Sequence, residues 1–369
     1  MIAIDVLPFF FKALTDSNND GKPHFLKFLL YYDEDLKMFR QKSTNELNSE
    51  LLEIYKNGSL VEGSVSSESG KIYINQIISY LFENFNLKKD SSVLEIGFGS
   101  GVLLKELKLQ GLEKLAGIEP GNHKVVEGLG GINLIRDFFP TALFKDKVDL
   151  IYSFGILEHL EDPLSFLTSQ INQINENGRI IFSVPNCEPY LNEGDLSIFI
   201  HEHFSYFTRD SIINLVKKTG FKTLDISVIE GALIATIGKQ GKELETNNSL
   251  ISKDVYFTKA NNLSNRISNL FQNYSESEIA IYAPMRAMNL LFISNKLNVR
   301  LIDDSTELHG KYLPSLSSKI ESFEELLVNP PKCLLIFSRT FGERIKQKCI
   351  MNIQLKNTEI ILLSDFETI

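Results

Sequence analysis

The feature that most constrains this chain is a short apolar run that ends in three alternating glycines. Residues 93–101 read Val-Leu-Glu-Ile-Gly-Phe-Gly-Ser-Gly, and leucines at helical spacing follow from Val102 onward. This order predicts a strand, a tight turn and then a helix. Because glycine has no Cβ, the backbone N–H groups of such a turn can approach a ligand closely. The sequence therefore predicts a ligand site here, although a tight turn that binds nothing would look the same.

Two classes of cofactor site begin with glycines of this kind. The dinucleotide pattern needs its third glycine one residue later, where this chain has Val102. The acidic-x-Gly-x-Gly-x-Gly form, from Glu95 to Gly101, resembles instead the first motif of the class I methyltransferases that depend on S-adenosylmethionine (SAM). In that family the turn holds the amino acid part of SAM. The resemblance implies SAM as the cofactor and S-adenosylhomocysteine as its product, with NAD as the alternative.

The same resemblance assigns further residues to the cofactor. Glu119, followed by Pro120, ends the expected second strand, where a carboxylate can accept hydrogen bonds from both ribose hydroxyls. Asp137 and Phe138 follow the next strand, where these enzymes hold the adenine amino group beside an apolar wall; a helix cap is the other interpretation of Asp137. The predicted cofactor residues are Glu95, Gly97, Phe98, Gly99, Gly101, Glu119, Pro120, Asp137, Phe138, Ser153, Phe154 and Ser67.

Residues 153–163 resemble the fourth-strand motif of the same methyltransferases. Ser153 and Phe154 open this segment and are the part assigned to SAM. His159 lies further along, where a histidine is more often structural or in contact with the cofactor edge. We therefore do not predict His159 as a catalytic base.

Apolar strands and amphipathic helices alternate after residue 64, which predicts a mostly parallel sheet covered on both faces. Strands are expected at 92–96, 115–119, 132–135, 148–153, 179–184, 222–229 and 232–238, with helices at 101–110, 162–174 and 209–219. The motifs fall at the carboxyl ends of these strands. Open α/β sheets bind their ligands at that edge.

A chain of 369 residues is long enough for more than one domain. We expect a mainly helical extension over 1–63, a Rossmann-like class I methyltransferase domain over 64–245, a linking helix within 246–277, and a smaller α/β domain over 278–369. The predicted fold class is α/β. The first turn of the last domain, Ala283–Ala287, contains no glycine, so its ligand cannot be inferred.

Composition narrows the range of partners. The net charge is −9 and no basic block is present, which argues against a nucleic-acid partner. No apolar run approaches the roughly 20 residues of a membrane span, and the first residues do not resemble a signal peptide. The three cysteines are scattered, which excludes a disulfide framework. We expect a cytoplasmic protein with a small-molecule acceptor; the sequence does not specify its oligomeric state.

A second informative segment, 200–208, reads Ile-His-Glu-His-Phe-Ser-Tyr-Phe-Thr. In an extended segment His201 and His203 would share one face, so a metal would need ligands from elsewhere. A neutral imidazole beside a carboxylate fits a general base better, and simple packing is the third interpretation. We predict no metal site. We predict His203 as the base, Glu202 as its orienting or acid partner, and His201 or Tyr206 near the oxyanion.

This segment resembles a narrower family, the sugar C-methyltransferases that act on nucleotide-linked keto-deoxysugars. Their Tyr-His-Glu-His-x-x-Tyr-Phe-Ser corresponds to 200–208, their Gly-Ile-Glu-Pro to 117–120, and their Ser-Ser-x-Ser to 66–69. The similarity covers about residues 64–369. It implies base-assisted, in-line transfer of a methyl group to carbon in a nucleotide-linked sugar or a related keto metabolite.

The chain also departs from that family. Residues 1–62 contain no cysteine, so the family's N-terminal zinc domain is absent from this sequence. Ile200 replaces the first tyrosine of the catalytic segment, and 229–234 lack the serine and arginine of its His-Gly-Gly-Ser-x-Arg strand. These changes leave two alternatives for the function. One is O- or N-methylation of a carbohydrate or small metabolite, and the other is SAM binding without catalysis.

Overall fold

The computed structural model describes residues 6–9, 25–56, 68–122, 124–247, 252–293, 298–313, 316–339 and 341–367. The chain divides into two compact units. One comprises Tyr31–Glu188 and Glu202–Leu250 and is named here the seven-stranded unit. The other comprises Met1–Leu30, Pro189–His201 and Ile251–Ile369 and is named the five-stranded unit. The expected domain over 64–245 is thus interrupted, because residues 189–201 belong to the other unit.

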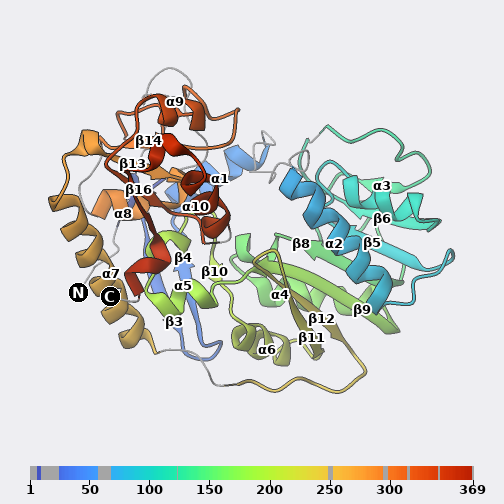
Figure 1. Ribbon diagram of the computed structural model, residues 1–369. Helices are drawn as coiled ribbons and strands as arrows, with labels where there is room; N and C mark the ends of the chain where they lie inside the picture. Colours follow the sequence, from blue (N-terminus) through green and yellow to red (C-terminus); the bar gives the residue numbers. More distant parts are fainter. Residues whose placement is uncertain are drawn as a thin grey trace. The chain divides into compact units, whose positions relative to one another are not determined.

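The first unit is built on a seven-stranded sheet with the order β11-β12-β9-β8-β5-β6-β7 (Figure 1). The neighbouring pairs from β9 to β7 are parallel, and β12 is antiparallel to both of its neighbours. The strands are β5 (Ser92–Ile96), β6 (Lys114–Ile118), β7 (Asn133–Ile135), β8 (Val148–Phe154), β9 (Ile174–Pro185), β11 (Lys222–Ile229) and β12 (Ala232–Gly238). The predicted α/β class and its Rossmann-like sheet are confirmed.

The strand order places a topological switch point between β5 and β8. From β5 the chain continues outward through β6 to β7, and then returns to the other side of β5 to form β8 and β9. Loops that leave neighbouring strands in opposite directions open a crevice at the strands' carboxyl ends. The segments after β5 and after β8 therefore define where this unit can bind a ligand.

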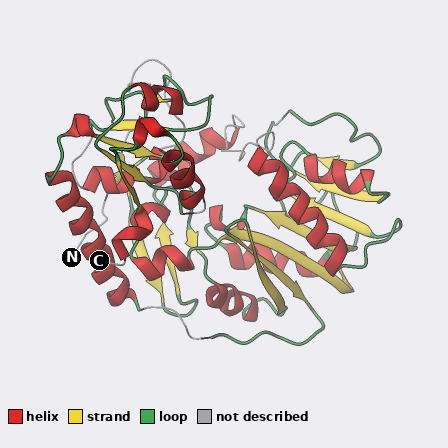
Figure 2. Cartoon of the chain, in the orientation of Figure 1, coloured by secondary structure: helices red, strands yellow, loops and turns green. Residues whose placement is uncertain are grey.

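Helices cover both faces of this sheet (Figure 2). Val93 packs with α2 (Glu68–Asn84) and α3 (Val102–Leu109) in one buried cluster. Its neighbour Leu94 packs with α4 (Pro163–Ser169) and α6 (Arg209–Lys217) in a second cluster. Successive strand residues point to opposite faces, so an apolar run is needed where both faces are buried.

The expectation of a mainly helical N-terminal segment is wrong for the described residues. They form β1 (Val6–Pro8), β2 (Phe25–Lys27), β3 (Leu29–Asp33) and β4 (Met38–Lys42) before the helix α1 (Asn45–Lys56). β1 pairs with β2, and β4 pairs with both β3 and β10 (Ser205–Tyr206). Runs rich in phenylalanine and tyrosine favour strands when partner strands are present, and here the partners decide. Much of the expected helical extension over 1–63, including residues 10–24 and 57–63, lies outside the described residues.

The five-stranded unit contains a parallel sheet with the order β15-β14-β13-β16-β17. Its strands are β13 (Ile279–Tyr282), β14 (Arg300–Ile302), β15 (Ile320–Glu321), β16 (Cys333–Ile336) and β17 (Glu359–Leu362), and its helices include α7 (Lys253–Gln272), α8 (Met288–Ile293), α9 (Phe323–Val328) and α10 (Gly342–Ile350). α7 lies within the stretch expected to hold a linking helix. No described helix is both long and apolar enough to cross a membrane.

Polar contacts hold segment 189–201 within the five-stranded unit. Arg339 Nε donates to Asp195 Oδ2 at 2.7 Å, and the Asp195 side chain is fully buried. Asn289 Nδ2 donates to two carbonyl oxygens of the same segment, at 2.9 and 2.8 Å. These contacts fix the backbone that leads directly into His201.

We predict that Arg339→Met lowers the free energy of unfolding by about 3–5 kcal/mol, because the Asp195 carboxylate stays buried without this cation. Urea unfolding of the full chain measures the change. Lys346→Met is the matched control, since its partner Asp365 is partly exposed, and it should cost less than about 1 kcal/mol. Equal stability of the two variants would contradict a structural role for the buried pair.

Candidate functional site

The glycine turn after β5 has the backbone geometry that the sequence predicted. Gly97, Gly99 and Gly101 all have positive φ angles, of 80°, 49° and 81°. A Cβ at Gly97 would lie 2.3 Å from Ile156 Cδ1, and one at Gly101 would lie 2.7 Å from Leu129 Cδ1. Both the backbone angles and the close packing therefore require glycine. α3 begins directly after the turn, so its first N–H groups can face a ligand there.

Glu119 connects this turn to the end of the neighbouring strand β6. Its buried carboxylate accepts a hydrogen bond from Gly99 N at 3.1 Å through Oε2, and from Gly121 N at 2.6 Å through Oε1. Each carboxylate oxygen can accept more than one hydrogen bond. The position of Glu119 at the end of β6, beside the glycine turn, fits the ribose-binding role predicted for this residue.

Glu95 lies one residue before the end of β5, and its side chain is buried. Tyr152 donates its hydroxyl to Glu95 Oε2 at 2.9 Å. Burial raises the pKa of Glu95 to about 8; the hydrogen bond from Tyr152 lowers it, and the nearby Glu119 adds to the rise. A cationic group beside Glu95 would favour the charged carboxylate, which fits the amino group of SAM.

Asp137 and Phe138 lie in a turn after β7 that is held by hydrogen bonds to the Asp137 side chain. The Asp137 carboxylate accepts from Phe138 N at 2.8 Å and from the Thr141 hydroxyl at 2.5 Å. No helix begins here among the described residues, so the helix-cap interpretation of Asp137 is wrong. The ring of Phe138 is 62% exposed, which leaves it available as one wall of a binding site.

The remaining predicted cofactor residues lie in varied surroundings. Phe98 is buried, with the Arg136 guanidinium 5.0 Å from the centre of its ring. Pro120 is exposed at the end of β6. Ser153 is fully buried near the end of β8, and the ring of Phe154 lies 5.2 Å from that of Tyr152. Ser67 lies outside the described residues.

The histidine segment does not keep the extended form assumed from the sequence. Residues 201 and 202 form a turn, and the two histidines have different neighbours. His201 packs against the rings of Phe9 and Phe28, and its Nε2 lies 3.2 Å from the Leu7 carbonyl oxygen. Burial lowers the pKa of His201 to about 4. These contacts all lie within the five-stranded unit, to which His201 belongs.

His203 belongs to the seven-stranded unit, where its ring meets His159 edge to face with 4.8 Å between the centres. The Tyr206 ring, fully buried, lies 6.4 Å away. His159 Nδ1 lies 2.9 Å from the carbonyl oxygen of Glu202, a residue whose side chain is also buried. Of the predicted catalytic residues, the structure therefore brings His203 and Tyr206 together and adds His159.

Glu158 completes this group. It lies beside His159 in the 3-10 turn η1 (Leu157–His159), just after the carboxyl end of β8. Its Oε1 lies 3.9 Å from His159 Nε2, and burial raises the pKa of Glu158 to about 8. We call Glu158, His159 and His203 the imidazole–carboxyl cluster. Glu158 was missed from the sequence, although a Glu-His pair just after a strand end was a visible signal.

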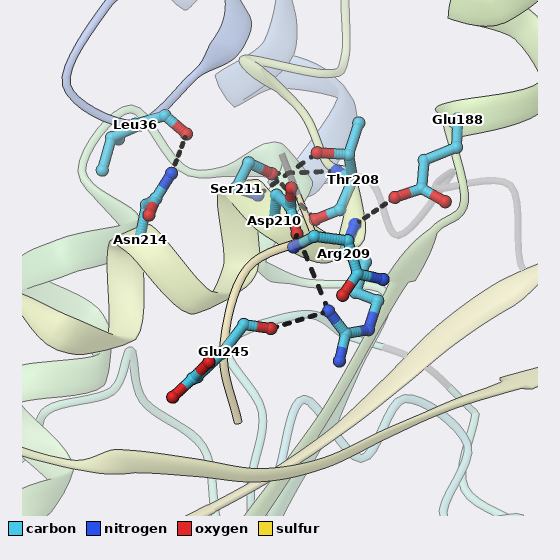
Figure 3. Close-up of polar contacts among 9 residues, drawn as sticks. Leu36, Glu188, Thr208, Arg209, Asp210, Ser211, Asn214 and Glu245 are labelled. Atoms are coloured by element: carbon cyan, nitrogen blue, oxygen red, sulfur yellow. Dashed lines mark hydrogen bonds and ion pairs between the residues drawn. The ribbon is translucent and has the colours of Figure 1, made fainter. Parts of the chain in front are cut away.

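The chain on the C-terminal side of His203 is firmly held. Phe204 N donates to the Glu158 carbonyl oxygen at 2.6 Å, so the segment is fixed next to the cluster. Figure 3 shows the following helix start, where Thr208 and Ser211 cap α6 reciprocally and Arg209 N donates to Glu188 at 2.8 Å. These contacts hold the backbone of His203 in place against η1.

The raised pKa of Glu95 predicts a pH dependence of stability. Below about pH 4.5 both the folded and unfolded states are protonated; between about pH 4.5 and 8 only the unfolded state loses the proton. The free energy of unfolding should therefore fall as pH rises through this window, by up to about 1.4 kcal/mol per pH unit from this group. Glu95→Gln should flatten the slope in denaturant unfolding series.

The exposed acid Glu83, on α2, provides the control for that series. Glu83→Gln should keep the slope of the wild-type chain. A slope for Glu95→Gln that equals the wild-type slope would show that Glu95 is already ionised in the folded protein.

Comparison with known proteins agrees with this geometry. The methyltransferase domain family matches residues 71–226. The chain is similar to the C-methyltransferase NovU of Streptomyces niveus, with 23% identity over 171 residues that cover 44% of this chain and 40% of the relative. It is also similar to the tRNA U34 carboxymethyltransferase of Tolumonas auensis, with 24% identity over 180 residues that cover 44% of this chain and 53% of the relative. The chain thus matches about half or less of the length of these relatives.

A solved structure that aligns with part of the chain is the Burkholderia thailandensis 1,6-didemethyltoxoflavin-N1-methyltransferase with bound 1,6-didemethyltoxoflavin and S-adenosylhomocysteine. The alignment has 13% identity and a TM-score of 0.41, and it covers 57% of this chain and 98% of the other. The family match spans the glycine turn and the strands β5 to β9, and it ends within β11. The family match therefore identifies residues 71–226 as a methyltransferase domain, in agreement with the SAM-dependent enzyme class that the sequence predicted.

Proposed function

We propose that the chain transfers the methyl group of SAM to a carbon atom of a small keto metabolite, with a nucleotide-linked sugar as the acceptor class to test first. The observation that carries the proposal is the place of His203. Its ring lies against His159, just beyond the carboxyl end of β8 and beside the switch point that also holds the glycine turn. A nitrogen base at this edge is what carbon methylation needs and what simple binding does not.

The chemistry explains that need. A carbon next to a ketone is only weakly acidic, so its proton must be removed by a positioned base. The oxygen that becomes negative also needs a hydrogen-bond donor or a positive charge. When bound, SAM supplies an activated methyl group on a positively charged sulfur. Holding that group and the acceptor carbon in line is the other task of the site.

The residues divide into three roles under this proposal. Glu119 and the glycine turn hold the ribose and the amino acid part of the cofactor, and Glu95 balances the cofactor's amino group. His203 takes the proton from the acceptor carbon. Glu202 and Tyr206 act as positioning residues, because Tyr206 is fully buried beside His203 and the carbonyl oxygen of Glu202 holds His159.

The relatives suggest two different classes of acceptor for the methyl group. One relative is named as a C-methyltransferase and the other as a tRNA carboxymethyltransferase. The net charge of −9 favours the small molecule, because a protein that binds the RNA backbone must neutralise phosphates with lysine and arginine. We therefore retain the prediction of no nucleic-acid partner as part of the proposal. The cytoplasmic location also stays a prediction.

The base assignment predicts a separation of cofactor binding from turnover. His203→Gln should keep SAM affinity within about twofold and lower turnover about 10²–10⁴-fold, the usual contribution of general-base catalysis. Calorimetry and a radiolabelled methyl-transfer assay measure the two quantities. His309→Gln, in the five-stranded unit, is the control and should keep both. Near-normal turnover of His203→Gln on its true acceptor would remove this histidine from catalysis.

The acceptor is tested by parallel assays with radiolabelled SAM. We expect label in a nucleotide-linked keto-deoxysugar and none in bulk tRNA, and NMR of the product should show the new methyl group on carbon. A methyl group on oxygen or nitrogen would favour the alternative activity, O- or N-methylation of a carbohydrate or small metabolite. Label in tRNA at low salt would overturn the small-molecule proposal, and tight SAM binding with no transfer to either class would favour a binding protein.

A further inference from the structure

The imidazole–carboxyl cluster has a property that methyl transfer does not use. Glu158, His159 and His203 each offer one metal-ligand atom, and these atoms all lie within 4.8 Å of one another. Two imidazoles and one carboxylate form a donor set that suits first-row divalent cations. All three residues belong to the seven-stranded unit and lie at the edge of the sheet where ligands bind.

The buried carboxyl group of Glu158 points to a ligand independently of this spacing. Glu158 is only 3% exposed, and its Oε2 has no hydrogen-bond partner among the described residues. A buried polar atom without a partner is costly, and the great majority of such atoms in folded proteins are satisfied. A cation held between Glu158 and the imidazoles would supply the missing partner.

The tautomer of His159 is the second argument. Its Nδ1 lies 2.9 Å from the carbonyl oxygen of Glu202, and a carbonyl oxygen can only accept. Nδ1 therefore carries the proton, and the lone pair is on Nε2, which lies 3.9 Å from Glu158 Oε1. Metal-bound histidines usually donate their second ring N–H to an acceptor of this kind, which fixes the ring for binding.

We propose that Glu158, His159 and His203 bind one first-row divalent cation, with Zn²⁺ or Fe²⁺ as the representative species. Ligand atoms around a tetrahedral ion at about 2.0–2.1 Å lie about 3.4 Å apart, so the cluster tightens when the cation binds. Three protein ligands leave at least one coordination position open to water or to an acceptor oxygen. The sequence predicted no metal because His201 and His203 would need ligands from elsewhere; the structure places Glu158 and His159 beside His203.

A consequence for catalysis rests on the proposed function. The lone pair of His203 cannot bind a cation and accept a proton at the same time. The cation-bound form should therefore be inactive in methyl transfer, and a chelator should restore turnover. The proposed cation site is therefore also a reversible inhibitory site that acts through His203.

The experiment uses Co²⁺ as the probe, because its visible absorption reports coordination without any turnover. The untagged full chain, freed of metal by a chelator, should bind one equivalent and develop bands typical of four or five ligands. Glu158→Gln and His159→Gln should each weaken binding by more than tenfold. His309→Gln should bind Co²⁺ as the wild type does, because His309 lies outside the cluster.

Glu158→Gln replaces a buried acid by a neutral group of the same shape, and S-adenosylhomocysteine binding by this variant shows that it is folded. Absence of saturable Co²⁺ binding, or equal affinity of wild type and Glu158→Gln, would overturn the cation site whatever the turnover. One-equivalent binding that depends on Glu158 supports the site. If such binding leaves methyl transfer unchanged, the site stands and the assignment of His203 as base fails.

Discussion

The rest of the site depends on the hydrogen bonds that the Glu119 carboxylate accepts. It accepts backbone hydrogen bonds from Gly99 and Gly121, and so joins the turn after β5 to the loop after β6. The turn, with its three positive φ angles, is also held by hydrogen bonds from Gly97 N to the Ile118 carbonyl oxygen and from Gly101 N to the Phe98 carbonyl oxygen, both at 2.7 Å. The buried acid at the end of β6 adds to the contacts that hold the ligand turn at the end of β5.

The second half of the site is organised around η1, directly behind β8. His159 takes its orientation from the carbonyl oxygen of Glu202, and Phe204 N donates back to the carbonyl oxygen of Glu158. Two short segments 43 residues apart thus hold each other through backbone groups. His203 lies between these two contacts in the sequence, so its position is fixed by the backbone on both sides. Such preorganisation is what a catalytic base or a metal ligand requires.

Much of this arrangement could be predicted because local pattern and fold agree. The central strands of the seven-stranded sheet are mostly apolar, β11 carries apolar residues among polar ones, and turn signals flank both kinds, so β5 and β11 match their expected bounds. The N-terminal strands could not be predicted, since one of the two partners of β4 lies at Ser205–Tyr206, far along the chain. No glycine or proline marks the turn at residues 201 and 202, which is why His201 was placed beside His203. The contact of His203 with His159 is equally non-local and has no signal in a single sequence.

Calorimetric titration of the full chain with S-adenosylhomocysteine tests the central claim most directly. We predict one site that binds S-adenosylhomocysteine with micromolar affinity. Glu119→Ala should weaken it by about 1.5–3 kcal/mol, as for the loss of hydrogen bonds to a charged acceptor, while Glu113→Ala at an exposed ion pair should not change it. Binding of NAD without binding of S-adenosylhomocysteine, or equal affinity of the Glu119→Ala variant, would contradict the cofactor site described for this domain.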